Sequence, residues 1–227
     1  MSLLGSLFRQ LVRRPPASSE PAARLHRGYA RLANFLEERR LDVYPEPPTE
    51  LHSDISRRMV AYVIENYGLK PGARVLDVGC GQGGTLELFK AAGLQATGIA
   101  LGDDVAICRQ RGLDVLEMDL SFLDFPDATF DLVWCRHALE HTIFPYFVLS
   151  ELARITKPDG LLYVEVPSPS SVCDHEANPN HYSILGKRMW HVLMYRAGFV
   201  GTDIQEIHVD LAVGPDLYWA FIRRRTA

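Results

Sequence analysis

The chain has 227 residues, a length that fits one sizeable α/β domain with a short appendage. Hydrophobic residues make up 47% of it and charged residues 23%, near the average for soluble globular proteins, which excludes wholesale disorder and a fibrous repeat. The formal net charge is -4, yet residues 1–40 carry eight arginines against three glutamates, so the remainder is acidic. Nucleic-acid binding depends on neutralising phosphates, and an acidic body therefore argues against RNA or DNA as a partner.

The four cysteines are widely spaced and form no CxxC pair. This spacing indicates neither a zinc knuckle nor a redox motif, so we expect reduced thiols. Asp174, His175 and Glu176 could bind substrate or an oxygen-preferring divalent metal, but consecutive side chains cannot all point inward, so we assign no metal site. No apolar run approaches the roughly 20 residues that cross a bilayer, and the N-terminal apolar stretch is too short for a signal peptide. Together these features predict a cytoplasmic location.

The N-terminal region is expected to be helical. Apolar residues recur at helical spacing within residues 3–14, with arginines on the other side, which predicts a short basic amphipathic helix. Such a helix fits a peripheral membrane contact, self-association or docking on its own domain, and the sequence leaves these alternatives open. A second helix is expected over residues 22–40, and a Pro-rich loop follows at 44–48. We assign residues 1–52 to this N-terminal extension.

The main domain, residues 53–227, begins with a helix that Ser53 can cap and Gly68 can end. Short apolar strands then alternate with helices, which implies βαβ units, right-handed crossovers and a parallel sheet. The strands are expected at residues 75–78, 96–100, 115–118, 132–135 and 161–166, and the helices begin near residues 84, 103, 145 and 187. Two extended runs, 200–209 and 217–223, follow without a helix between them. The sequence thus predicts a doubly wound, mostly parallel seven-stranded sheet with an antiparallel C-terminal strand.

A glycine-rich segment follows the first expected strand and opens a helix; it reads Asp77-Val78-Gly79-Cys80-Gly81-Gln82-Gly83-Gly84. Glycines allow a sharp turn and let a ligand approach the backbone, and N–H groups at a helix start favour an anionic group. The glycine pattern alone fits a dinucleotide equally well. Asp77 separates the two cases, because a carboxylate attracts an ammonium group and repels a pyrophosphate.

The segment VLDVGCGQGG, residues 75–84, resembles motif I of the class I S-adenosylmethionine-dependent methyltransferases. Residues 125–142 resemble the fourth-strand region of that family, and residues 152–167 resemble its next helix, turn and fifth strand. Residues 181–199 resemble the helix and following strand of a subgroup that acts on small molecules and sugars. The resemblance implies a Rossmann-like fold, S-adenosylmethionine as cofactor and S-adenosylhomocysteine as product.

The same resemblance implies where the cofactor binds. The acid and the glycines of motif I face its methionine and ribose, Asp119 lies near the adenine, and His137 lines the pocket. The ribose-binding acid that the family usually carries is replaced here by Ala100. Either Asp103 or Asp104 would reach in from the following turn, or the backbone and water would hold the ribose hydroxyls. The expected cofactor contacts are Asp77, Gly79, Cys80, Gly81, Gly83, Asp103, Asp119, Leu120 and His137.

Loop histidines are the candidates for acid–base chemistry. A hydroxyl acceptor must lose a proton on methylation, and histidine titrates near neutral pH. His137 and His141 follow the fourth strand, and His175 and His181 follow the fifth, at the sheet edge where doubly wound folds bind ligands. We expect His175 to be the base, with His181 and His137 as the alternatives. The long polar loop over residues 167–180 is typical of a functional lid.

The sequence therefore predicts methyl transfer from S-adenosylmethionine to a small molecule or a sugar, at a hydroxyl group. Fourth-strand residues read WCRH rather than the [ND]PP[YFW] motif, which argues against a nucleobase amine as the acceptor. Two alternatives stay open. One is a methyltransferase-like scaffold subunit without activity, and the other is an NAD(P)-dependent oxidoreductase on a similar sheet.

Overall fold

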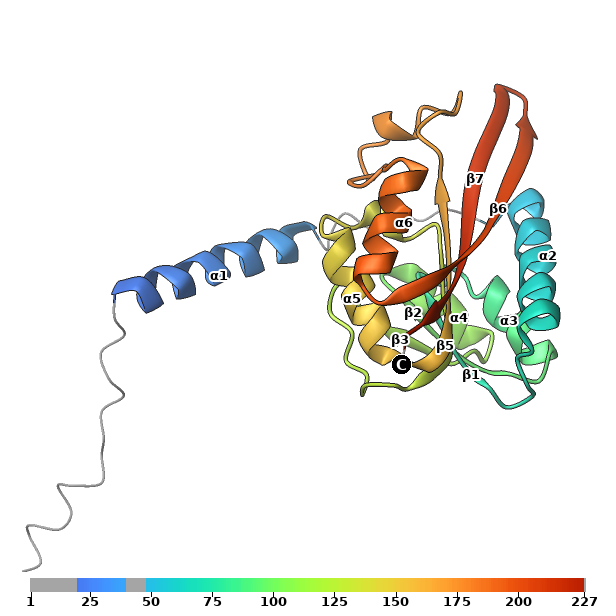
Figure 1. Ribbon diagram of the computed structural model, residues 1–227, viewed down its shortest axis with the longest axis horizontal. Helices are drawn as coiled ribbons and strands as arrows, with labels where there is room; N and C mark the ends of the chain where they lie inside the picture. The colour runs from blue at the N-terminus through green and yellow to red at the C-terminus, as the bar shows by residue number, and fades with distance from the viewer. Residues whose placement is uncertain (1–19, 40–47, 227) are drawn as a thin grey trace, which may run out of the picture. The chain divides into compact units, whose positions relative to one another are not determined.

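The computed structural model describes residues 20–39 and 48–226 (Figure 1). The chain divides into two compact units, residues 1–42 and 43–227, and each is described by itself. In the first unit, α1 (Glu20–Arg39) agrees with the helix expected over residues 22–40. The amphipathic helix expected over residues 3–14 lies outside the described residues. Within the described ranges, no helix is both long and apolar enough to cross a membrane.

The second unit is built on a seven-stranded sheet with the strand order β3-β2-β1-β4-β5-β7-β6. β7 pairs antiparallel with both of its neighbours, and the other four pairings are parallel, so β7 runs against the other six strands. The doubly wound sheet with an antiparallel C-terminal strand is confirmed. The strands are β1 (Arg74–Val78), β2 (Gln95–Ala100), β3 (Val115–Glu117), β4 (Phe130–Arg136), β5 (Thr156–Pro167), β6 (Phe199–Leu211) and β7 (Gly214–Arg225).

The helices begin at or near the predicted residues. They are α2 (Glu50–Tyr67), α3 (Gly84–Ala91), α4 (Asp103–Gln110), α5 (Pro145–Ile155) and α6 (Lys187–Arg196), with short 3-10 turns η1 (Leu139–His141) and η2 (His175–Ala177). The expected cap of α2 was wrong. Thr49 is the N-cap, because its hydroxyl accepts the amide of His52, while Ser53 donates back to the Thr49 carbonyl. Gly68 ends α2 in the left-handed conformation, as expected.

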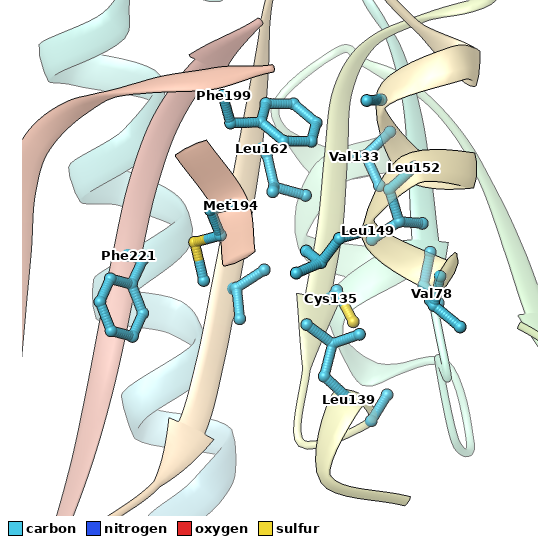
Figure 2. Packing of buried hydrophobic residues seen from close by; sticks show 14 of the residues in the cluster. Val78, Val133, Cys135, Leu139, Leu149, Leu152, Leu162, Met194, Phe199 and Phe221 are labelled. Atoms are coloured by element: carbon cyan, nitrogen blue, oxygen red, sulfur yellow. The ribbon is translucent and has the colours of Figure 1, made fainter. Parts of the chain in front are cut away.

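Helices cover both faces of the sheet, as Figure 1 shows for α5 and α6 on one side and α2 and α3 on the other. The side of α5 and α6 is closed by apolar contacts in which Leu149, Leu152 and Met194 pack on Val133 and Leu162 (Figure 2). Alternate strand residues face the opposite layer, since successive strand side chains point to opposite faces. Burying both faces explains why the strands read as nearly continuous apolar runs.

The second layer starts with α2, whose residues Ile55 and Val63 are fully buried against the sheet. Trp134 of β4 and Tyr163 of β5 belong to the same layer and stack with ring centroids 3.6 Å apart. The domain boundary predicted after residue 52 falls inside α2. Because this helix is part of the core, we propose that the sheet-containing domain starts before Glu50.

Candidate active site

The strand order reverses between β1 and β4, which is the point where doubly wound sheets bind ligands at the carboxyl ends of their strands. Asp77 lies next to the end of β1 and is 2% exposed. Its Oδ2 has no hydrogen-bond partner within the described part of the chain. Burial raises the pKa of Asp77 to about 7, although the nearby Arg136 opposes this shift. A buried carboxylate with an unpartnered oxygen is a site prepared for a cation.

The loop after β1 needs glycine for two separate reasons. Gly79 and Gly83 have φ angles of 72° and 82°, in the left-handed region that side chains disfavour. A Cβ on Gly79 would lie 2.9 Å from the Cβ of Ala138, and one on Gly83 would lie 3.0 Å from the Sγ of Cys108. The absence of side chains therefore keeps the loop tightly turned against both η1 and α4.

Cys80 holds this loop in place. Its amide and that of Gly79 both donate to the carbonyl of Ile99 at 3.0 Å, and its own carbonyl accepts the amide of Gly83 at 2.9 Å. The side chain is buried in an apolar cluster with Leu86. We infer from these bonds that Cys80 shapes the loop, and the cofactor contact expected of it stays a prediction.

The end of β2 lacks an acid, and Asp104 stands nearby. Ala100 is buried, but the Oδ2 of Asp104 lies 4.0 Å from the position that a Cβ on Gly81 would take. Burial raises the pKa of Asp104, and a side-chain hydrogen bond to Gln82 opposes the rise. Asp103 is exposed to solvent. Of the two acids that the sequence offered for the ribose, the geometry favours Asp104 over Asp103.

Asp119 follows β3 at the same edge of the sheet. The amide of Met118 donates to the carbonyl of Ala100 at 3.1 Å, which places the end of β3 beside the end of β2. The Oδ1 of Asp119 accepts the amide of Ser121 at 2.7 Å and closes a tight turn. The adenine contact expected of Asp119 stays a prediction, and the neighbouring Leu120 is partly buried against the core.

A buried network of charges lies at the ends of β4 and β5. Glu165 is fully buried; its Oε1 lies 2.8 Å from the Nε of Arg136 and 3.0 Å from the Nε2 of His137, and the Tyr163 hydroxyl donates to its Oε2. The Nδ1 of His137 lies 3.3 Å from the Oε1 of Glu140. Burial and Arg136 disfavour a charged His137, but its hydrogen bonds to Glu140 and Glu165 outweigh them and raise its pKa to about 9.

This arrangement argues against His137 as a base. Both of its ring nitrogens donate to carboxylates, so no lone pair is left to accept a proton. Its φ of 49° is uncommon for a residue other than glycine, and the surrounding ion pairs hold it there. We infer that His137 fixes the wall of the site as an imidazolium.

His175 is placed differently, beside a buried aspartate. Its Nε2 lies 3.0 Å from the Oδ1 of Asp216, whose side chain is 1% exposed. Burial opposes ionisation of Asp216, but hydrogen bonds from Ser171, Tyr218 and His175 hold its pKa well below the usual range. Because Nε2 donates to this carboxylate, the lone pair of His175 lies on Nδ1. The pair has the relative arrangement of a general base and the acid that orients it.

His181, the second candidate base, has both ring nitrogens engaged. Its Nδ1 donates to the carbonyl of His175 at 2.8 Å, and its Nε2 accepts from the side chain of Asn178 at 3.3 Å. Its ring centroid lies 5.8 Å from that of His175. We infer that His181 supports the loop that carries His175. Among the three candidate bases, His175 is the one whose second ring nitrogen has no hydrogen-bond partner among residues 20–39 and 48–226.

Tyr218 joins the His175–Asp216 pair to the charged network. Its ring centroid lies 4.6 Å from that of His137 and 6.0 Å from that of His175, and its hydroxyl donates to Asp216 at 2.5 Å. His52 of α2 completes the wall, with its Nδ1 3.0 Å from the Nη2 of Arg136. Burial, with the charges of His137 and Arg136, lowers the pKa of His52 to about 4, so this ring is neutral.

Comparison with known proteins identifies the domain. Residues 76–164 match the family model described as "Methyltransferase domain". This chain carries a class I methyltransferase domain. The matched segment runs from β1 into β5 and thus contains Asp77, the glycine loop, Arg136, His137 and Glu140, while Glu165, His175, His181 and Asp216 lie beyond it.

Relatives of the methyltransferase domain act in several pathways. A sterol 24-C-methyltransferase of Yarrowia lipolytica is 32% identical over 172 residues, which are 69% of this chain and 44% of that protein. A ubiquinone biosynthesis O-methyltransferase of Methylococcus capsulatus is 35% identical over 100 residues, covering 40% of this chain and 42% of that protein. The crystal structure of a SAM-dependent methyltransferase from Archaeoglobus fulgidus matches with a TM-score of 0.61 at 22% identity, covering 74% and 94% of the two chains.

The chain spans about a third to a half of the length of the curated relatives that it matches. The domain that these relatives share with this chain is that of S-adenosylmethionine-dependent methyltransferases. The residues at the end of β1 fit that cofactor. The unpartnered Oδ2 of Asp77 suits its ammonium group. The glycines leave the backbone open to close approach, and Asp104 lies beside Gly81 in the same loop region.

Three residues of the site escaped the sequence analysis. Asp216 follows a proline next to a turn and looks like an ordinary turn residue, so no local pattern marks it. Glu165 lies within the apolar run Leu161–Pro167, and a lone acid in a buried strand was a signal that could have been used. His52 was the last residue assigned to the extension, one residue before the expected helix start, and its contact with Arg136 depends on the tertiary fold.

Proposed function

We propose that the methyltransferase domain transfers a methyl group from S-adenosylmethionine to a hydroxyl group of a small molecule or sugar, with His175 as the base. The observation that carries the proposal is the hydrogen bond between His175 and the buried Asp216. A base oriented in this way is needed for a hydroxyl acceptor, because its proton must leave as the new bond forms. The named relatives, which include sterol and quinone methyltransferases, support a small-molecule acceptor.

Residues at the ends of β1, β2 and β3 would hold the cofactor. The carboxylate of Asp77 would bind the ammonium group, Asp104 the ribose hydroxyls and Asp119 the adenine amino group. S-adenosylmethionine supplies the electrophilic methyl group when bound. The protein's part is to align the acceptor with that group and to remove its proton, since methyl transfer is an in-line displacement.

The acceptor's proton would move to the Nδ1 of His175. The Nε2–H of His175 donates to Asp216, so this carboxylate selects the required tautomer and stabilises the imidazolium that forms. Hydrogen bonds from Ser171 and Tyr218 keep Asp216 ionised and fixed. Tyr218 lies between His175 and His137 of the charged network, with its ring centroid 6.0 Å from that of His175 and 4.6 Å from that of His137.

Two measurements test this proposal. Calorimetric titration is expected to show binding of S-adenosylhomocysteine and no binding of NAD(H). If neither compound binds, methyl transfer is contradicted and a scaffold function is favoured. Radiolabelled cofactor is then offered with a panel of hydroxylated metabolites. With an accepted substrate, His175→Gln is expected to lower kcat about 100-fold or more while leaving S-adenosylhomocysteine affinity unchanged.

His208 provides the matched control, because it is a histidine of β6 with a 70% exposed side chain. His208→Gln is expected to keep the full rate. A His175→Gln variant with the rate of the wild type would show that the proton leaves by another route, and the role of His175 would be withdrawn.

A further inference from the structure

A second group of side chains, next to the His175–Asp216 pair, has the composition of a metal site. It consists of Glu140 and His141 of η1 and His181 of the loop that follows η2. One carboxylate oxygen and one nitrogen of each ring lie within 4.8 Å of one another. We name these three residues the Glu-His-His cluster.

The carboxylate of the cluster has an unsatisfied oxygen. Glu140 is 1% exposed, its Oε1 faces His137, and its Oε2 has no hydrogen-bond partner within the described ranges. A buried anionic oxygen without a partner is costly, and a cation would remove that cost.

The two rings are oriented as metal-binding histidines usually are. The Nδ1 of His141 donates to the carbonyl of Asn180 at 2.9 Å, and the Nδ1 of His181 donates to the carbonyl of His175 at 2.8 Å. Metal-ligating histidines typically donate their other ring N–H to a carbonyl or carboxylate, which fixes the tautomer. Both Nε2 atoms therefore carry the lone pair. The Nε2 of His181 would exchange only its long 3.3 Å bond from Asn178 for the metal.

The backbone holds the cluster together in the absence of any ion. The amides of Tyr182 and Ser183 donate to the carbonyl of Glu140 at 2.8 and 2.9 Å. The hydroxyl of Ser183 donates to the carbonyl of Thr142 at 2.7 Å. These bonds join η1 to the loop after η2, so the ligands come from segments about 40 residues apart and are already in register.

We propose that the Glu-His-His cluster binds a divalent transition metal ion, and that zinc suits it best. Two imidazoles and one carboxylate form a common zinc ligand set, which leaves a fourth position for water. Zinc–ligand bonds of about 2.1 Å would draw the three atoms to about 3.4 Å from one another, a small closure for side chains on a loop. The cysteine spacing offered no hint of this site, because none of its ligands is a cysteine.

A second location could hold the metal ion instead. It is formed by Cys173, His175 and Asp216. Asp216 already accepts hydrogen bonds from the Ser171 and Tyr218 hydroxyls, from His175 and from the amide of Leu217. Burial raises the pKa of the Cys173 thiol, which disfavours the thiolate that binds metals. The geometry therefore favours the Glu-His-His cluster. A metal at the competing location would have the Cys173 thiolate as a ligand, and absorption spectroscopy detects such a ligand.

The experiment uses the full chain, stripped with a chelator and titrated with Zn²⁺ by calorimetry and with Co²⁺ by visible absorption. We expect one ion per chain and a low-symmetry cobalt spectrum without a thiolate charge-transfer band. His141→Gln and His181→Gln are each expected to weaken zinc binding by at least roughly 100-fold, more than the loss of a supporting hydrogen bond produces. His208→Gln, at an exposed position, is expected to bind as the wild type does.

Folding is checked by the melting temperature of each variant in chelator, and Zn²⁺ is expected to raise that of the wild type and of His208→Gln only. A His181→Gln variant that melts like the wild type in chelator and still binds zinc with full affinity would overturn the proposal. So would a charge-transfer band that disappears in Cys173→Ser, or the absence of stoichiometric binding. None of these outcomes depends on methyl transfer, so the metal site and the proposed function can fail separately.

Discussion

His175 and Asp216 lie 41 residues apart in the chain, and the Nε2 of one is 3.0 Å from the Oδ1 of the other. The first belongs to the short turn η2 and the second to the start of the antiparallel strand β7. Strand β7 pairs with β5 along its length, with Pro167 opposite Tyr218, so it returns the chain to the point where the η2 loop leaves the sheet. The antiparallel strand thereby supplies the acid that contacts the proposed base.

Asp216→Asn is expected to lower kcat about 100-fold or more, because an amide can donate to Nε2 and so favour the wrong tautomer of His175. Cofactor affinity should stay within a factor of about two, since Asp216 lies away from β1. Steady-state kinetics and S-adenosylhomocysteine titration measure the two effects. Ser171→Ala removes one hydrogen bond from the same carboxylate and serves as the milder control; an equal loss in both variants would speak against a tautomer effect.

The raised pKa of Asp77 predicts that cofactor binding depends on pH. Its pKa of about 7 leaves much of the protein with a neutral Asp77 below pH 7, and an ammonium group requires the carboxylate. Affinity for S-adenosylhomocysteine is therefore expected to rise between pH 6 and 8, with proton release in calorimetry. Asp77→Asn should bind about 10-fold more weakly or worse and lose this dependence. If the affinity of Asp77→Asn for S-adenosylhomocysteine still depends on pH, a group other than Asp77 is responsible for the pH dependence.

The same shift predicts a gain in stability. In the folded protein without cofactor, the pKa of Asp77 is raised from 3.8 to about 7, so the folded state loses stability as pH rises from about 4 to about 7. Asp77→Asn removes this loss. Its melting temperature without cofactor is expected to exceed that of the wild type at pH 8 and to match it more closely at pH 5. The reverse order would show that Asp77 is not buried as described.

Asp104 and Asp103 form a matched pair for the ribose contact. Asp104→Ala is expected to weaken S-adenosylhomocysteine binding about 10-fold, because a charge-assisted hydrogen bond to a hydroxyl contributes roughly 1.5 kcal/mol. Asp103→Ala changes an exposed residue of the same helix turn and should stay near the wild type. Calorimetry on both variants measures their affinity for S-adenosylhomocysteine. If only Asp103→Ala loses affinity, Asp103 rather than Asp104 contacts the ribose.

The raised pKa of His137 predicts a second pH effect, on the free energy of unfolding. Its pKa is raised from 6.5 to about 9, so the stabilisation from its ion pairs is complete below pH 6.5 and is lost as pH rises through about 9. His137→Gln is expected to cost about 3 kcal/mol at pH 6, because two buried carboxylates lose their partner. Denaturant titrations at pH 6 and pH 9 measure the difference. The cost should shrink at pH 9, and a constant cost would point to packing instead.

The glycine loop offers a steric test on adjacent positions. Gly83→Ala places a Cβ at a φ of 82° and 3.0 Å from the Sγ of Cys108, whereas a Cβ on Gly84 meets nothing within 4 Å. Gly83→Ala is expected to destabilise the fold by about 2 kcal/mol and to weaken cofactor binding. Gly84→Ala, in a helix, should be neutral or slightly stabilising. Chemical denaturation and calorimetry compare the two, and equal behaviour would contradict the strain argument.

Much of the fold was readable from local patterns. Strands β1, β2 and β4 and helices α3, α4, α5 and α6 start within about two residues of their predicted positions, because buried parallel strands are continuous apolar runs and glycine or proline marks their ends. Asp77 and the glycine loop were equally visible, since the tight turn demands glycine in a short window. The cap of α2 was misplaced because Thr49 and Ser53 are both acceptable caps, and packing of the helix chooses between them.

The sequence alone determined the sheet, the glycine loop after β1 and the set of histidines from which a base could come, because each depends on residues close together in the chain. The tertiary structure decided which histidine is available. His137 is held between Glu140 and Glu165, and His175 faces Asp216, through contacts between segments as much as 41 residues apart. Protonation and tautomer follow from the groups that surround a ring in space, and those neighbours become known only when the strands are paired.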